Sequence, residues 1–367
     1  MNSKTKTPLF HVAKRGALPW YKSWAIRGAA LLLAVVFCGL ITTLVTGQNP
    51  LQVYLAIFNG SFGSPRKIWV LLQNIAMLLC VSLAVTPAFR MRCWNLGAEG
   101  QALIGGLAAA ACMILLPKAG FPHWAILCCM TVASLAAGAI WAAIPAIFKA
   151  RFNTNETLFT LMMNYVATQL VAFYCVVWES PKGSGTIGII NPQTELGWFP
   201  QLGTYKYLLN ILIVAAVCLA MYGYLNYSKH GYEIAVVGES ERTARYVGIK
   251  VERVIIRTML LSGALCGLAG LLLVGSTNHT LTTTIVDGRG FTAVMVSWLA
   301  HFNPIWMVAT SFLLVFLGRG AGEIVTKFGL NRSFGDILTG VILFFIIGSE
   351  FFINYQIKFR KSGEKEA

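Results

Sequence analysis

Long apolar runs limit this chain more than any other feature, because several of them exceed the roughly 18 residues needed to cross a bilayer. We therefore expect an all-α fold, a polytopic membrane helical bundle of about ten transmembrane segments. The eighth segment is too short for a full crossing and is expected to be a broken or half-helix element. The predicted segments are residues 24–46, 68–89, 94–116, 122–148, 154–178, 206–227, 254–275, 290–302, 304–321 and 332–355.

Composition and charge agree with a membrane protein. Only 12% of the residues are charged, against about a quarter in soluble domains, and the mean hydropathy is +0.66. The net charge of +15 does not indicate nucleic acid, since Lys and Arg stand at segment ends without interleaved aromatic residues. Twenty of the 29 basic residues fall on one side if the N-terminus is inside, so both termini are predicted to be cytoplasmic.

The remaining composition adds little chemistry. The nine cysteines lie in or beside apolar runs without metal-ligand spacing, and we interpret them as reduced, small hydrophobic residues. Residues 1–23 form a polar, basic extension, and because no small-residue cleavage site follows the next apolar run, that run is predicted to be a retained span. Residues 51–58 are an amphipathic piece expected along the outer surface, and the loop 179–205 is expected to be an ordered cap or docking surface.

A polar cluster begins the third segment. Asn95, Glu99 and Gln101 precede a run of Gly, Ala, Leu and Ile, and polar groups inside a span should face a protein interior or a water-filled path. Gly97 and Gly100 are predicted to interrupt the helix there. The alternative is that Glu99 caps a helix at the interface or accepts backbone N–H groups, and that the glycines serve close packing.

A second polar stripe lies on the fifth segment. Glu156, Thr160 and Asn164 recur every four residues and so share one face of a helix. Such a stripe should line a water-accessible interior. The alternative is that these side chains hold two helices together.

The longest polar inner segment is residues 228–257. Within it, Ser240 to Tyr246 predicts a short helix that ends at Gly248. A short exposed helix between two spans suits contact with a cytosolic partner. An ordinary basic loop that follows the positive-inside rule is the alternative.

Motifs for enzyme chemistry or nucleotide binding are missing from the sequence. It has no G-x-x-x-x-G-K-[ST], H-E-x-x-H or G-x-S-x-G, and its five histidines are scattered. Gly183 to Gly188 spells G-x-G-x-x-G, but no strand precedes it and no helix follows, so it does not predict a dinucleotide site. No enzyme activity and no cofactor are expected in this chain. One possible function is a stand-alone channel or an ion-coupled carrier for a small polar solute. In that case Glu99 or Glu156 would titrate in the path.

These stretches resemble a known family. Arg90-x-Arg92-x-Trp94-Asn95-Leu96-Gly97-Ala98-Glu99-Gly100-Gln101 is similar to the permease subunits of ABC importers for nucleosides and simple sugars, a branch of the branched-chain amino-acid permease superfamily. So are Asn155-Glu156 with Thr160-Leu-Met-x-Asn164-Tyr165, Gly238-Glu239 with Ala244 to Ile249, Gly288 to Phe291, and Asn303-Pro304. The resemblance covers roughly residues 68 to 350.

The resemblance implies a transmembrane permease domain at 24–355, with cytoplasmic segments at 1–23 and 356–367, in a bacterial cytoplasmic membrane. It implies a solute that is a nucleoside or a simple sugar. The implied partners are a cytosolic ABC ATPase that uses ATP, a second related permease in a homo- or heterodimer, an extracytoplasmic substrate-binding lipoprotein, and membrane lipid but no nucleic acid. Asn95, Glu99, Gln101, Glu156, Thr160 and Asn164 are predicted to border the substrate pathway, and Glu239, Arg242, Ala244, Arg245 and Gly248 to couple to the ATPase.

Overall fold

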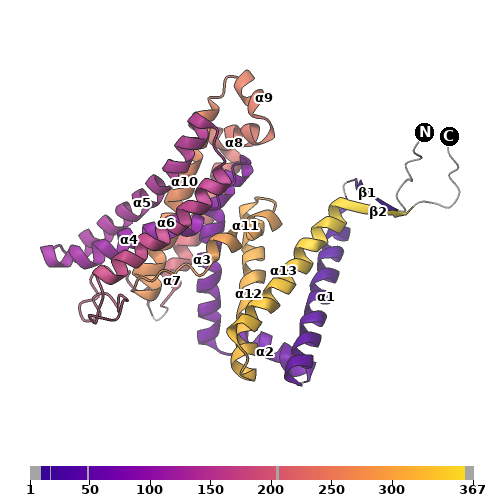
Figure 1. The fold of residues 1–367 in the computed structure, drawn as a ribbon, viewed down its shortest axis with the longest axis horizontal. Helices are drawn as coiled ribbons and strands as arrows, with labels where there is room; N and C mark the ends of the chain where they lie inside the picture. Colours follow the sequence, from indigo (N-terminus) through magenta and orange to yellow (C-terminus); the bar gives the residue numbers. More distant parts are fainter. Residues whose placement is uncertain (1–9, 17, 48, 204–205, 360–367) are drawn as a thin grey trace, which may run out of the picture. The chain divides into compact units, whose positions relative to one another are not determined.

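The computed structural model describes residues 10–16, 18–47, 49–203 and 206–359. Residues 1–9 and 17 of the predicted extension, 204 and 205 of the predicted cap, and 360–367 of the predicted tail lie outside that part. Helices dominate it (Figure 1). In chain order the elements are β1 (Phe10–Lys14), α1 (Trp20–Thr46), α2 (Pro50–Phe62), α3 (Pro65–Arg90), α4 (Ala98–Leu115), the 3-10 helix η1 (Pro117–Ala119), α5 (His123–Phe152), α6 (Glu156–Val177), α7 (Leu208–Tyr227), α8 (Lys229–Glu239), α9 (Glu241–Tyr246), α10 (Val251–Leu272), the π-helical turn η2 (Leu273–Asn278), α11 (Arg289–Leu299), α12 (Pro304–Phe328), α13 (Arg332–Asn354) and β2 (Tyr355–Phe359).

The predicted all-α membrane bundle is confirmed. Within the described residues, nine helices are long and apolar enough to cross a membrane. They correspond to nine of the ten predicted segments, and the eighth, predicted to be too short, is the 11-residue helix α11. The nine are Tyr21–Val45, Pro65–Arg90, Ala98–Ala119, His123–Phe152, Glu156–Val177, Leu208–Tyr227, Val251–Asn278, Pro304–Phe328 and Ser333–Asn354.

The chain divides into two compact units, of which the first combines Met1–Lys67 with Phe316–Ala367. In this unit α1 packs along α13, and Arg27 pairs with Glu350 at 2.6 Å, since a charge near lipid needs a partner. β1 pairs with β2 in antiparallel register, with Phe10 opposite Phe359. The amphipathic piece predicted at 51–58 lies in α2, which packs against α1.

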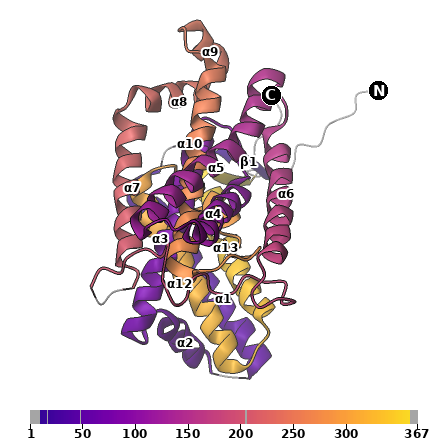
Figure 2. The same ribbon diagram turned by 90° about the vertical axis from the view of Figure 1, so that its left-hand side faces the viewer.

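The second unit, Ile68–Val315, holds the polar stretches singled out above. Its centre is the packing of α4, α5 and α10, with α6 and α7 to either side in Figure 2. Glycines make that packing close, because a Cβ on Gly105 or Gly138 would fall against the backbone of Gly267. Small residues at helix contacts are what membrane helices use to approach one another. α4, α5 and α10 therefore pack at close range in the core of this unit.

The inner polar segment is more helical than predicted. Its first part, residues 229–239, forms α8, which the sequence analysis had not predicted. Ser228 and Ser240 start α8 and α9, because each hydroxyl accepts a backbone N–H in the first turn. Figure 1 shows α9 at the tip of one end of this unit. α10 then runs from there to η2 at the far end.

Candidate functional site

The chain between α3 and α4 is the break that the sequence predicts. Residues 91–97 are not helical, and Gly97 is the N-cap of α4. The prediction that Gly100 also interrupts the helix is wrong, because Gly100 lies inside α4. Its missing side chain serves close packing instead, since a Cβ there would lie 2.8 Å from the Asn164 amide oxygen. The break therefore ends where α4 meets α6.

Asn95 and Gln101 face each other across this break. The Asn95 Nδ2 donates to Gln101 Oε1 at 3.2 Å, and Gln101 Nε2 donates back to Asn95 Oδ1 at 3.0 Å. Asn95 also donates to the Ser262 hydroxyl of α10 at 2.9 Å and accepts the Gly97 N–H at 3.0 Å. Both amides are fully buried. These bonds fasten the non-helical stretch to α10.

Thr160 and Asn164 fasten the same stretch to α6. Asn164 Oδ1 accepts the Gly100 N–H and its Nδ2 donates to the Leu96 carbonyl, each at 2.8 Å. The Thr160 hydroxyl accepts the Leu96 N–H at 3.2 Å. We call Asn95, Gln101, Thr160 and Asn164 the amide node. Glu156, one turn before Thr160 on the predicted common face, pairs with Lys149 at 3.0 Å.

Glu99 reaches a different part of the chain. Its Oε1 accepts the Gly288 N–H at 2.9 Å and its Oε2 accepts the Gly290 N–H at 2.7 Å. Gly290 lies so close to Glu99 that a Cβ there would lie 2.5 Å from the Glu99 nitrogen. Glu99 thus accepts backbone N–H groups, as the alternative held, but those of residues 288–290 rather than of its own break. Whether any of the six predicted residues borders the substrate route stays a prediction.

A cavity of about 530 Å³ lies beside residues 288–290 and was not predicted. Its volume falls within the roughly 300–1,000 Å³ of small-molecule sites. α3, η2 and the segment between η2 and α11 supply most of its wall. The lining residues are Val70, Gln73, Asn74, Met77, Tyr207, Leu273, Thr277, Asn278, Thr280, Thr282, Thr284, Ile285, Asp287 and Arg289. We call this the polar cavity.

Three side chains from α3, α7 and η2 bond to one another at the polar cavity, and two of them, Gln73 and Thr277, line it. Gln73 Nε2 donates to the Thr277 hydroxyl at 2.6 Å, and the buried Asn210 of α7 donates to both Gln73 and Thr277 at 3.3 Å. The widened π-helical turn carries Thr277, whose hydroxyl donates to the Leu272 carbonyl at 3.2 Å. Such turns are frequent at functional sites. Arg289 borders the same cavity and donates to Asn74 Oδ1 at 3.1 Å.

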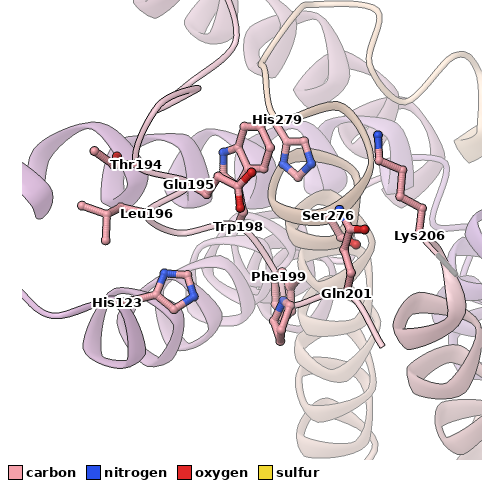
Figure 3. A pocket seen from close by; sticks show the side chains of 11 residues that line it. His123, Thr194, Glu195, Leu196, Trp198, Phe199, Gln201, Lys206, Ser276 and His279 are labelled. Atoms are coloured by element: carbon pink, nitrogen blue, oxygen red, sulfur yellow. The ribbon is translucent and has the colours of Figure 1, made fainter. Parts of the chain in front are cut away.

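A second hollow, of about 430 Å³, lies beside Ser276 of η2 (Figure 3). There the His279 ring stacks on Trp198, with centroids 3.7 Å apart and 6° between the planes. The backbone next to Trp198 also bonds to η2, because the Phe199 N–H donates to the Gly275 carbonyl at 3.0 Å. Burial, followed by the nearby Lys206, lowers the pKa of His279 from its ordinary 6.5. The loop that contains Trp198 and Phe199 thus contacts η2, the turn that also lines the polar cavity.

The same loop contains the G-x-G-x-x-G string. Gly183 and Gly185 have positive φ and donate their N–H groups to the Glu179 carboxylate at 2.8 and 3.0 Å. These bonds lower the pKa of Glu179. The string closes on an acidic side chain of its own loop, with no helix of the described chain at its end. The N–H groups of Gly183 and Gly185 therefore bind the Glu179 carboxylate, and the string does not form a phosphate-binding loop.

Three of the predicted coupling residues, Arg242, Ala244 and Arg245, lie on α9, while Glu239 ends α8 and Gly248 follows α9. Only Ala244 is buried, and Tyr246 is 92% exposed. Gly248 has φ +85° and ends the helix, with the Ile249 N–H donating to the Ala244 carbonyl at 2.9 Å. Arg245 pairs with Glu252 at 3.3 Å through two largely exposed side chains. The predicted short helix and its glycine stop are confirmed.

Comparison with known proteins assigns this architecture. A family profile described as "branched-chain amino acid transport system / permease component" matches residues 68–347. The guanosine ABC transporter permease protein NupP of Bacillus subtilis is 29% identical over 89% of this chain and 94% of its own. The nucleoside ABC transporter permease protein NupB of Lactococcus lactis is 27% identical over 86% and 89%. The glucose ABC transporter permease protein TsgB13 of Haloferax volcanii is 24% identical over 91% and 90%.

The polar cavity was not predicted from the sequence, although the sequence contains signals of it. Gln73 and Asn74 are adjacent amides inside an apolar span, and Val70, Gln73, Asn74 and Met77 follow helical spacing on one face. Four threonines, at 280, 282, 283 and 284, stand close together before Gly288. Each signal is weak alone, and only the fold joins them around one space.

Proposed function

Because the chain belongs to the family of permease components of branched-chain amino acid transport systems, we propose that it carries nucleosides, with a simple sugar as the second candidate solute. The chain is a permease subunit of an ABC importer and is not an enzyme. Membership in this family sets aside the stand-alone channel and the ion-coupled carrier. The observation that carries the nucleoside proposal is the match to two nucleoside permeases over most of both chains.

Permeases of ABC importers act with an ATPase and a substrate-binding protein. For this chain we propose a cytosolic ABC ATPase, a second related permease, and an extracytoplasmic lipoprotein that delivers the solute. ATP would bind to the ATPase, and this chain would hold no cofactor of its own. α9 supports the ATPase contact because it is exposed at one end of its unit and anchored through Ala244.

The membrane orientation is a further part of the proposal. The chain is a multi-pass membrane protein. We propose that it lies in the bacterial cytoplasmic membrane with both termini and α9 inside, which the distribution of Lys and Arg supports. A thiol reagent added from outside should label Lys182→Cys and not Arg242→Cys. The reverse pattern would invert the topology.

The direct test is ATP-driven uptake by the complete importer in proteoliposomes. With the loaded lipoprotein, guanosine should enter faster than glucose and only when ATP is present. Arg245→Glu should abolish uptake while the complex assembles, because its exposed ion pair stabilises the fold by only about 0–1 kcal/mol. Lys182→Glu, an equal charge change in the loop at the other end, is the control and should leave uptake unchanged.

Two results would count against this function. Uptake of glucose without guanosine would replace the nucleoside by a sugar. Normal uptake by Arg245→Glu would remove α9 from the coupling role. Gly248→Trp is also expected to stop transport, but its positive φ means that such a substitution strains the backbone as well.

A further inference from the structure

The polar cavity differs from the amide node because several of its side chains are left without hydrogen-bond partners in the described chain. Within the described chain, Asn278, Thr282 and Thr284 make no side-chain hydrogen bond, and Asn74 uses only its oxygen. Asn278 and Thr284 are exposed, so the cavity opens at the surface of its unit. These groups remain able to bind a solute.

The chemistry of the wall selects a class of solute. Hydroxyl groups donate and accept hydrogen bonds, and side-chain amides carry one acceptor oxygen and one donor nitrogen. This wall therefore complements a solute rich in hydroxyl groups. Asp287 and Arg289 have opposite charges, and no other charged residue of the described chain lines the cavity, which favours a neutral solute over a phosphate ester. The same wall includes Val70, Met77, Leu273 and Ile285, an apolar surface suited to the face of a base.

We propose that the polar cavity is a nucleoside-binding site on the transport route, in which Thr282, Thr284 and Asn74 bind the ribose hydroxyls. This inference rests on the proposed function and adds the place and the groups that recognise the solute. Few and individually weak hydrogen bonds suit a conduit, since a site that binds tightly cannot release.

Glu99 acts in this site as a positioning residue. Its two oxygens hold the N–H groups of Gly288 and Gly290, on either side of Arg289. Arg289 in turn reaches Asn74 across the cavity. Glu99 therefore fixes the backbone that presents Asp287 and Arg289, while its own oxygens are already occupied. A charged group buried in a span is retained where it has such partners.

The test compares two solutes in the complete importer. Uptake of radiolabelled guanosine and of 2′,3′-dideoxyguanosine is measured in proteoliposomes, each at concentrations that saturate the lipoprotein. The wild type should prefer guanosine. The double variant Thr282→Val/Thr284→Val should lower guanosine uptake about tenfold, from two lost hydrogen bonds, and bring the ratio of the two solutes close to one.

The matched control is Thr283→Val, which removes a hydroxyl from the residue between them that does not line the cavity. It should keep the wild-type ratio. Complex assembly and basal ATP hydrolysis are followed in parallel to show that each variant folds. An unchanged ratio in the double variant, whether uptake stays normal or falls equally for both solutes, would overturn the proposal. Failure of the wild type to take up any nucleoside would instead show that the proposed function is wrong, and this inference would fall with it.

Discussion

The amide node and the polar cavity are both polar regions inside the same unit, yet their side chains are used differently. In the node, Asn95 and Gln101 bond to each other, and Asn164 bonds to the backbone of Leu96 and of Gly100. In the cavity, Thr282 and Thr284 surround an open space of about 530 Å³. Polar residues of this unit thus serve either as interhelical contacts or as a surface for solute, and side chains left unpaired mark the second role.

The largest effect is expected from a substitution that removes hydrogen bonds of the amide node. Asn164→Leu removes the partners of the Gly100 N–H and the Leu96 carbonyl, and two unpaired buried groups should destabilise the fold by about 2–4 kcal/mol. We expect a lower melting temperature and little assembled complex. Thr168→Val is the control one turn along the helix, because its hydroxyl bonds only within α6. Full assembly of Asn164→Leu with an altered choice of solute would move the node into the transport route.

Glu99 lies between the two regions and should show an intermediate effect. Glu99→Gln keeps the size of the side chain but turns one acceptor into a donor that faces a backbone N–H. We expect assembly and basal ATP hydrolysis to persist while guanosine uptake falls about tenfold, the loss of roughly one charged hydrogen bond.

The positioning role of Glu99 has its own readout. The preference for guanosine over its dideoxy analogue should shrink in Glu99→Gln, since the wall of the cavity has moved. Loss of assembly would make the residue purely architectural. Lower uptake with an unchanged preference would separate Glu99 from the cavity.

The smallest expected effect concerns the second hollow beside η2, where His279 stacks on Trp198. Because the folded pKa of His279 lies below its ordinary 6.5, the unfolded chain binds the proton first, and stability contributed there is full above pH 6.5 and declines as the pH falls below it. Lys206 and Glu195 line the same hollow.

Acidification should therefore loosen the contact of His279 with Trp198 without affecting the amide node. The melting temperature of the purified permease should fall more between pH 7.5 and pH 5.5 in the wild type than in His279→Asn, which keeps a residue tolerant of positive φ. Equal decreases in both proteins would exclude His279 as the group responsible.

Most of the fold could be predicted because its determinants are local. Apolar length indicates the spans, and even the short α11 is visible as a run that ends too soon. The spacing of Glu156, Thr160 and Asn164 predicts their common face, and Gly248 predicts the end of α9. Each of these features depends on neighbours within one or two helical turns.

The site was harder because its determinants are distant in sequence. Three side chains bond to one another although more than 200 residues separate the first from the last, namely Gln73, Asn210 and Thr277. No single segment predicts which residues of the other two it will contact. Gly100 was assigned to a helix break because the sequence does not show that Asn164 packs against it. Polar residue types predict that a partner exists, but the fold decides whether that partner is protein or solute.

The most direct test of this account is a map of the complete importer with guanosine present and the lipoprotein docked. We predict density for the nucleoside in the polar cavity, with ribose oxygens about 2.7–3.2 Å from Asn74, Thr282 or Thr284, and an intact hydrogen-bonded node. Nucleoside density beside Asn95 and Gln101, with their mutual hydrogen bonds broken, would contradict it.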